Sequence, residues 1–237
     1  MTNLVATSLD ETSQWKRLLN NGLVSNLIVL FLSLILSFVG GVLNRRVVPR
    51  LSFDSRRTLN SSELTNQFTR DASVVVTPDD GLLAQGDGAH GHSNARYNNL
   101  IVQSFSIAAA IKPIRKENIE NYWRAGFTMR KPDGNESVTV HIDNHNLLVG
   151  YLGGQLRLRI PLTSNFENRW TLVQLDLSCI PPVERTTVHC HIGKHSWYVG
   201  EIPNVDFPLT LQLRAWSDEH QRHRIFFRDI SLSHPVA

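Results

Sequence analysis

The chain has 237 residues, 41% hydrophobic and 19% charged, a composition typical of a globular protein with a full core. Its net charge of +3 comes from the first 65 residues, which hold seven of the 24 basic and four of the 21 acidic residues. The remainder is neutral, which argues against a nucleic-acid-binding surface. Two cysteines are too few for a disulfide-framed secreted domain and match no zinc signature.

The first expected element is a membrane-spanning helix over residues 23–43, preceded by a polar tail over residues 1–22. The segment reads LVSNLIVLFLSLILSFVGGVL and carries no charge. At about 1.5 Å per residue it spans roughly 30 Å, the thickness of the hydrocarbon core. The run is longer than that of a cleavable signal peptide and ends in Asn44-Arg45-Arg46. We therefore expect a retained single-pass anchor in a lipid bilayer; the alternative, a buried core helix, rarely lacks a polar face.

Small residues recur along the expected anchor at Ser33, Ser37 and Gly41. A spacing of four residues places them on one stripe of the helix, where small side chains let another backbone approach closely. The stripe predicts packing against another transmembrane helix or a membrane complex. Because serine and glycine are common in such helices, a chance pattern is the alternative.

The side of the membrane is predicted from basic residues. Three arginines follow the anchor closely: Arg45, Arg46 and Arg50. Only Lys16 and Arg17 precede it. Basic flanks stay in the cytoplasm, so the charge pattern favours a cytoplasmic C-terminal domain. The sequons at Asn60 and Asn135 favour the opposite side, where they would permit glycosylation.

Residues 44–70 are polar and arginine-rich and read as a juxtamembrane linker, with a β domain over residues 71–237. Apolar and polar residues then alternate in short segments, for example at 137–143, 156–160 and 209–215. Period two is the mark of strands with one buried face. Turns rich in Gly, Pro and Asp separate these segments, which predicts a mainly β protein with an antiparallel β-sandwich.

Four segments, in chain order, carry a family resemblance: Phe105–Ile107 with Ile111-Lys112-Pro113, Trp170–Val173, Val188–Ile192 with Gly200, and Phe226–Ser233. Their order resembles the concanavalin A-like lectin/glucanase jelly roll, in particular its laminin-G-like branch, over residues 70–235. The resemblance implies a jelly-roll sandwich that binds a glycan or a protein. The calcium ligands of some laminin-G-like domains cannot be placed here, so no cofactor is expected.

Catalytic chemistry is not visible in the sequence. Hydrolases of this fold carry two carboxylates projecting from one strand, and no predicted strand offers such a pair. Glu117 and Glu120 fall in a loop, Glu201 stands alone, and no other catalytic motif is found. We therefore expect a non-catalytic binding module or accessory subunit. The alternatives are a membrane-anchored jelly-roll glycoside hydrolase with displaced acidic residues, and a histidine-rich metal-binding domain.

The metal alternative rests on His189, His191 and His195. The first two alternate with Cys190 and would face outward on one strand, a workable pair of zinc or copper ligands. A metal site needs three or four converging ligands, and surface histidine is the simpler explanation. No metal is therefore expected.

The two cysteines leave a choice open. Cys179 and Cys190 are equidistant from a turn between Glu184 and Arg185, so a symmetric hairpin would place them opposite one another and within disulfide reach. In a reducing compartment they would be two small buried hydrophobic residues.

A glycan site would need exposed aromatic side chains. Five candidates are available: Trp123, Trp170, Trp197, Tyr198 and Trp216. Most are expected to be core residues.

Overall fold

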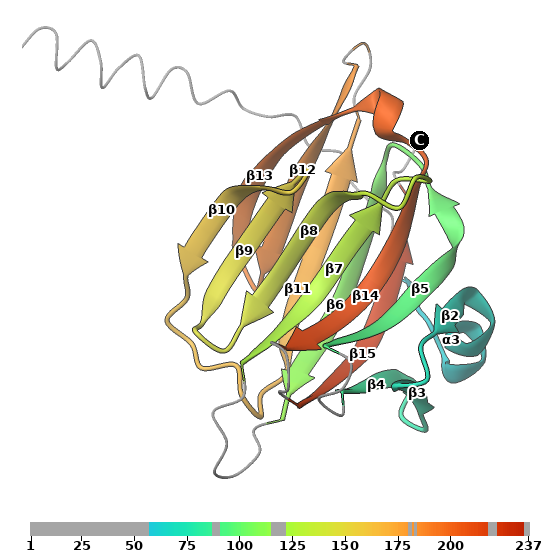
Figure 1. Cartoon of the computed structure of the whole chain (residues 1–237), viewed down its shortest axis with the longest axis vertical. Helices are drawn as coiled ribbons and strands as arrows, with labels where there is room; N and C mark the ends of the chain where they lie inside the picture. Colours follow the sequence, from blue (N-terminus) through green and yellow to red (C-terminus); the bar gives the residue numbers. More distant parts are fainter. Residues whose placement is uncertain are drawn as a thin grey trace, which may run out of the picture. The chain divides into compact units, whose positions relative to one another are not determined.

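The computed structural model describes residues 57–86, 91–114, 122–179, 182, 184–217 and 222–234, which fold into two antiparallel β-sheets packed face to face (Figure 1). This confirms the predicted mainly β sandwich. Across these residues, no helix combines the length and apolar character that a membrane span requires. The anchor predicted at 23–43 lies outside the described residues, as do its small-residue stripe and the three arginines that follow it.

The first sheet has seven strands in the order β10-β9-β8-β7-β14-β5-β2. In that order the strands are β10 (Gln155–Pro161), β9 (Leu147–Leu152), β8 (Glu136–Asp143), β7 (Trp123–Arg130), β14 (Leu209–Ser217), β5 (His92–Ile101) and β2 (Phe68–Arg70). Neighbours far apart in sequence, such as β7 and β14, bring together residues that the local pattern cannot relate.

The second sheet has eight strands, seven of them in the order β13-β12-β11-β6-β15-β4-β3, with β1 paired to β15. They are β13 (His195–Pro203), β12 (Arg185–Ile192), β11 (Thr171–Ser178), β6 (Phe105–Pro113), β15 (His223–Ser233), β4 (Gly81–Gly86), β3 (Val74–Thr77) and β1 (Arg57–Thr58). A short 3-10 helix, η1 (Asn204–Asp206), joins β13 to β14.

The hydrophobic core lies between the sheets, and strand alternation builds it. On β14, the core-facing residues Leu209, Leu211, Leu213 and Ala215 are buried, and Arg214 faces outward, in agreement with the alternation over 209–215. Strand β6 lies in the middle of its sheet and is buried on both faces over most of its length, which accounts for its continuous apolar run.

The domain begins earlier than predicted, so residues 57–70 are not a linker. They form β1, the helix α3 (Ser61–Gln67) and β2, and their apolar side chains Leu59, Leu64 and Phe68 are buried in the core. The helix starts at Asn60, whose side chain accepts a hydrogen bond from the N–H of Glu63 in a capping box. Three buried side chains spread over ten residues are too sparse to give a periodic signal.

Of the two alternatives for the cysteines, the structure does not show the bridged pair, because neither Cys179 nor Cys190 is in a disulfide. In the ladder between β11 and β12, Leu175 lies opposite Cys190, and Ser178 lies opposite Thr187. Cys179 is thus four residues from the position opposite Cys190, about 13 Å along a strand, whereas a disulfide needs Cα atoms within about 7 Å. The ladder centres the connection between the strands two residues earlier in the chain than a turn between Glu184 and Arg185 would.

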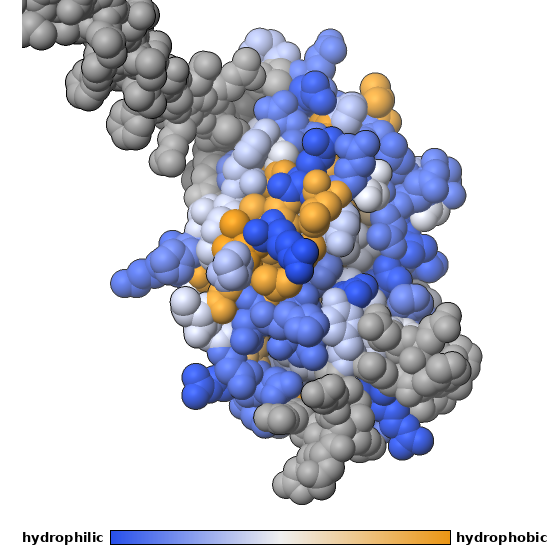
Figure 2. Space-filling view, turned by 60° about the vertical axis from the view of Figure 1, so that its left-hand side comes forward, coloured by the Kyte–Doolittle hydropathy of each residue, from blue (hydrophilic) through white to orange (hydrophobic). Residues whose placement is uncertain are grey.

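Strands β10 and β13 form one edge of the sandwich, at the left of Figure 1. A bulge in β10 between Leu156 and Leu158 turns Leu158 and Ile160 toward the core, while Arg157 and Arg159 stay exposed. Figure 2 brings this side forward and shows hydrophobic surface interrupted by strongly hydrophilic side chains.

Candidate functional site

The richest polar and aromatic surface is the outer face of the seven-stranded sheet. Strand pairing sets its rows: His141 of β8, Gly126 of β7 and Arg214 of β14 lie side by side. In the next row Arg124 of β7 lies between Asp143 of β8 and Trp216 of β14. The hairpin of β7 and β8 and the distant strand β14 therefore supply one surface.

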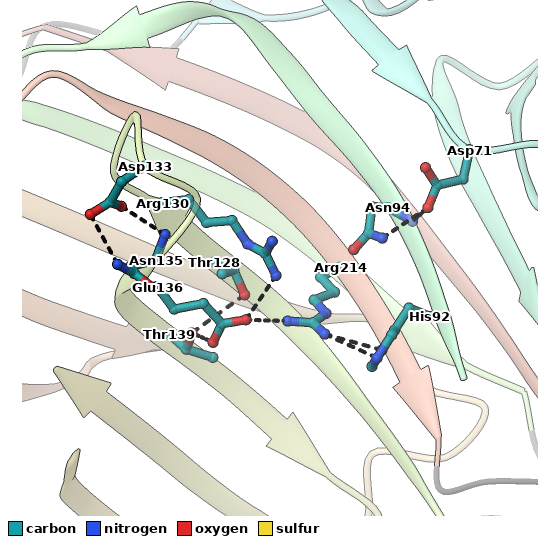
Figure 3. A network of polar contacts seen from close by, with 10 residues as sticks. All are labelled: Asp71, His92, Asn94, Thr128, Arg130, Asp133, Asn135, Glu136, Thr139 and Arg214. Atoms are coloured by element: carbon teal, nitrogen blue, oxygen red, sulfur yellow. Dashed lines mark hydrogen bonds and ion pairs between the residues drawn. The ribbon is translucent and has the colours of Figure 1, made fainter. Parts of the chain in front are cut away.

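Glu136 is the centre of a charged network on this face (Figure 3). Its Oε1 atom accepts hydrogen bonds from Arg214 Nη1 at 2.6 Å and Arg130 Nη2 at 3.0 Å, and its Oε2 atom accepts from Thr139 at 3.1 Å. Burial alone would raise the pKa of the Glu136 carboxyl, but the charge and hydrogen bonds of Arg214, with those of Thr139 and Arg130, outweigh it and lower the pKa. The carboxylate therefore stays ionised.

Arg214 links this network to the aromatic residues. Its Nη2 atom lies 3.1 Å from His92 Nδ1, and its guanidinium carbon lies 5.0 Å from the centre of a Trp216 ring. Only 11% of its side chain is exposed. A guanidinium held by a carboxylate and an indole face is a preorganised donor with one fixed orientation.

His141, Trp216 and Tyr151 form an aromatic platform beside Arg214. The ring centres of His141 and Trp216 are 4.9 Å apart in an edge contact, and Tyr151 stacks over His141 at 6.2 Å. Gly126 makes the room: a Cβ atom there would lie 2.1 Å from the carbonyl oxygen of Val140. The missing side chain at Gly126 therefore lets the backbones of β7 and β8 approach closely beside His141.

The imidazole of His141 is neutral at physiological pH. Burial, and then the nearby charges of Arg124 and Arg214, lower its pKa from 6.5 to about 3. Its Nδ1 atom is buried and has no hydrogen-bond partner among the described residues. A neutral imidazole offers one donor and one acceptor, the complement of a hydroxyl group.

The platform is bordered by partly exposed groups. Arg124 donates to the hydroxyl of Tyr122 at 2.7 Å and lies over its ring, and Tyr122 contacts His145 with ring centres 5.3 Å apart. Asp143 does not face a ligand, because its Oδ1 accepts the backbone N–H groups of His145 and Leu147. The side chains left at the border are aromatic or cationic.

Several polar atoms of this face are buried without a hydrogen-bond partner in the described part of the chain: Asn94 Oδ1, Arg130 Nε, His141 Nδ1 and Arg214 Nε. Native proteins pair most buried polar atoms, so such a concentration on one face indicates groups that water or a ligand completes.

The predicted histidine site is not assembled. His189 and His191 lie on the outer face of the other sheet, but His191 Nε2 pairs with Asp176 Oδ2 at 2.8 Å, and His195 is exposed at the start of β13. Nowhere in the described ranges do three His, Cys, Asp or Glu side chains gather as a metal site would require.

The five aromatic candidates for a glycan site differ in their burial. Trp123 and Trp216 are buried, Trp197 is partly buried, and Trp170 and Tyr198 are exposed on the eight-stranded sheet. Sequence reasoning missed Tyr151, Arg124 and Glu136 as members of a site. Their outward positions could be inferred from alternation, but the pairing of β7 with β14 that joins them to Arg214 leaves no local signal.

Comparison with solved structures supports the predicted jelly-roll sandwich as a fold. A protein of unknown function from Saccharomyces cerevisiae superposes with a TM-score of 0.53 over 76% of this chain and 100% of its own, at 15% identity. The Crh5 transglycosylase in complex with NAG gives 0.54 over 80% and 88%, at 9% identity. The Emp46p carbohydrate recognition domain gives 0.51 over 73% and 90%, at 10% identity.

At these identities the likeness establishes the fold alone. No family model matches the sequence, and no curated protein is similar to it.

Proposed function

We propose that this protein is a non-catalytic carbohydrate-binding module held at a membrane by residues 23–43. The observation that carries the binding half is the platform of His141, Trp216 and Tyr151 beside the fixed guanidinium of Arg214. Glycan sites combine aromatic faces, which cover the apolar side of a sugar ring, with convergent polar groups that bind its hydroxyls. The glycan recognition named for Emp46p, which has the same fold, supports this proposal.

The partly exposed side chains at the border of the platform, Tyr151, Tyr122 and Arg124, contact the sugar. His141 and Trp216 lie beneath them and fix their orientation. Arg124, Arg130 and Arg214 outnumber the two acidic side chains of β8 on this face, and this cationic excess also suits a glycan bearing a carboxylate or sulfate.

The arrangement of carboxylates supports a binding role over hydrolysis. On the outer face of β8 the acidic side chains are Glu136 and Asp143, seven residues apart. At about 3.3 Å per residue their Cα atoms lie roughly 23 Å apart, whereas glycoside hydrolysis needs carboxyl groups about 5–10 Å apart. Both are also occupied, one by arginines and the other by backbone amides.

The membrane half of the proposal rests on the uncharged segment 23–43, and the arginines after it support a cytoplasmic position for the domain. A carbonate wash of membranes tests the anchor, since an integral chain stays in the pellet. Protection of the β domain from protease in sealed membrane vesicles tests which side of the membrane it occupies. Thiol state does not report the side, because Cys179 and Cys190 are out of register.

The binding test uses full-length protein in mild detergent on an array of neutral and acidic glycans, followed by calorimetry on the best ligand. Tyr151→Ala should weaken binding about tenfold, or about 1.4 kcal/mol, because it removes the exposed ring of the platform. Tyr198→Ala is the matched control, since Tyr198 also packs on a histidine, His189, but on the other sheet.

Equal loss of affinity in both variants, or no glycan bound by folded protein, would overturn the glycan site. A cleaved glycan in the same incubation would instead establish the hydrolase alternative.

A further inference from the structure

One end of the sandwich carries a group of exposed apolar side chains. Leu100, Val102 and Val205 are 56%, 57% and 88% exposed. They belong to the end of β5, the turn after it, and η1, and pairing of Ile101 with Leu209 and of Leu100 with Thr210 brings these segments together. Three large apolar side chains held in water at one end require an explanation.

An open hollow of about 720 Å³ lies at the same end. It is lined by Val102, Gln103, Ser104, Phe207, Pro208 and His234. The apolar part of this lining continues the exposed group, so the surface is a shallow apolar depression with polar groups at its border. It lies away from the platform around Gly126.

The chain from the expected anchor enters the domain at this end. Arg57, the first residue of β1, pairs with Leu232 of β15, two residues before His234 in the lining of the hollow. Figure 1 shows η1 and the C-terminal end of the chain together there. Residues 44–56 connect the anchor to β1; about 13 residues reach at most about 45 Å, so this end cannot move far from the bilayer.

We infer that this end of the sandwich docks on the surface of the bilayer that holds residues 23–43, with Leu100, Val102 and Val205 in the interfacial layer. The inference rests on the membrane half of the proposed function. A tether converts docking into an intramolecular step, so a small apolar surface suffices where a free protein would need a larger one.

The charges at this end do not oppose docking. Lys131 Nζ lies 2.7 Å from Asp206 Oδ1, which neutralises the acidic residue beside Val205. Arg57 is paired with Glu63, and the connecting segment adds four arginines that anionic headgroups attract, Arg45, Arg46, Arg50 and Arg56, against one acidic residue, Asp54. An anionic lipid surface therefore complements both the apolar group and its tether.

The test places an environment-sensitive fluorophore on single cysteines of the full chain in vesicles of phosphatidylcholine and phosphatidylserine. Labels are introduced as Val102→Cys and Val205→Cys in a Cys179→Ser background, where Ser keeps an acceptor for Asn204. Cys190 needs no replacement, because burial and then Asp176 raise its pKa to about 12 and suppress the thiolate. Doxyl-labelled lipid then serves as the quencher.

Val75→Cys is the matched control, since Val75 is 51% exposed. Val75 pairs with Leu83 of β4, and Leu83 pairs with Phe226 of β15. Phe226 lies six residues before Leu232, the residue opposite Arg57, so Val75 is about 20 Å along the strands from the docking end. Labels at positions 102 and 205 should shift to shorter wavelength and lose most of their emission to the quencher. The label at position 75 should do neither.

Equal quenching at all three positions, or none at positions 102 and 205 in chains that resist a carbonate wash, would overturn the docking surface. Shifted emission without lipid quenching would assign the surface to a protein partner, which also overturns it. If the chain does not remain with the vesicles after the carbonate wash, the anchor hypothesis is contradicted. The amount of chain in the vesicle pellet shows this before any fluorescence is measured.

Discussion

The outer faces of the two sheets each hold a histidine that faces outward, and the two have opposite surroundings. On the eight-stranded sheet, His191 pairs with the buried carboxylate of Asp176, which also accepts hydrogen bonds from Ser106 at 2.7 Å and Gln174 at 2.5 Å. On the seven-stranded sheet, His141 lies between arginines and its buried nitrogen has no partner in the described chain. The first arrangement is a closed polar network, and in the second the buried imidazole lies beneath the partly exposed ring of Tyr151.

The comparison shows that alternation along a strand decides only which way a side chain points. What the side chain does is decided by neighbouring strands, here β6 and β11 for His191 and β7 and β14 for His141. Histidine beside a carboxylate becomes part of the scaffold, and histidine beside guanidinium groups is kept neutral.

The largest expected effect comes from adding a side chain at Gly126, beneath the aromatic platform. Gly126→Ala should destabilise the protein by about 3 kcal/mol, because the new Cβ meets backbone atoms of Val140 and His141 that cannot move alone. Denaturant unfolding monitored by tryptophan fluorescence measures it.

Gly150→Ala is the control in the same sheet, where the Cβ would lie 2.8 Å from a methyl group of Val199. A side chain yields more readily than backbone, so this variant should lose less than half as much stability. Equal losses would show that the seven-stranded face has no special requirement at Gly126.

A smaller effect should distinguish the two charged networks. Asp176→Asn should cost about 2 kcal/mol, since a buried carboxylate with three hydrogen-bond partners loses its charge. Glu136→Gln should cost about 1 kcal/mol or less, because 37% of its side chain is exposed and water screens its pairs. The reverse order in urea unfolding would contradict the assignment of the Asp176 network as scaffold.

The last expected effect is a dependence of stability on pH. Burial lowers the pKa of His141 to about 3, and burial followed by the charge of His92 lowers that of His223 to about 4, both from an ordinary 6.5. Acid therefore protonates the unfolded chain first. The stability is complete well above pH 6.5 and falls toward pH 4, by about 1.4 kcal/mol per histidine at pH 5.5.

Thermal unfolding of His141→Gln at pH 7.5 and pH 5.5 checks this dependence. The variant should lose part of the acid sensitivity, and the exposed His195→Gln should keep all of it. A variant as acid-sensitive as the parent would show that His141 is not neutral.

The sandwich itself was accessible from the sequence, because periodic segments such as 137–143 and 209–215 report their own buried faces. The site was not. Arg214 was predicted to face outward, but its partners Glu136 and His92 come from strands 78 and 122 residues away. No local pattern states which strands become neighbours.

The two corrections have the same origin. Residues 57–70 join the sandwich through partners far along the chain, since β1 pairs with β15 and β2 with β5. The pairing of Cys179 with Cys190 assumed a symmetric loop, whereas register is set by the whole ladder and its packing.

The edge formed by β10 bears on how the protein behaves at high concentration. An edge strand offers unpaired backbone groups to a second molecule. The exposed apolar side chain of Leu156 on β10 would favour pairing of a second copy at this edge. Arg157 and Arg159 project from the same strand, so two copies that approach along this edge bring like charges together. The arginines of β10 therefore act as gatekeepers against edge-to-edge aggregation, independently of anything the domain binds.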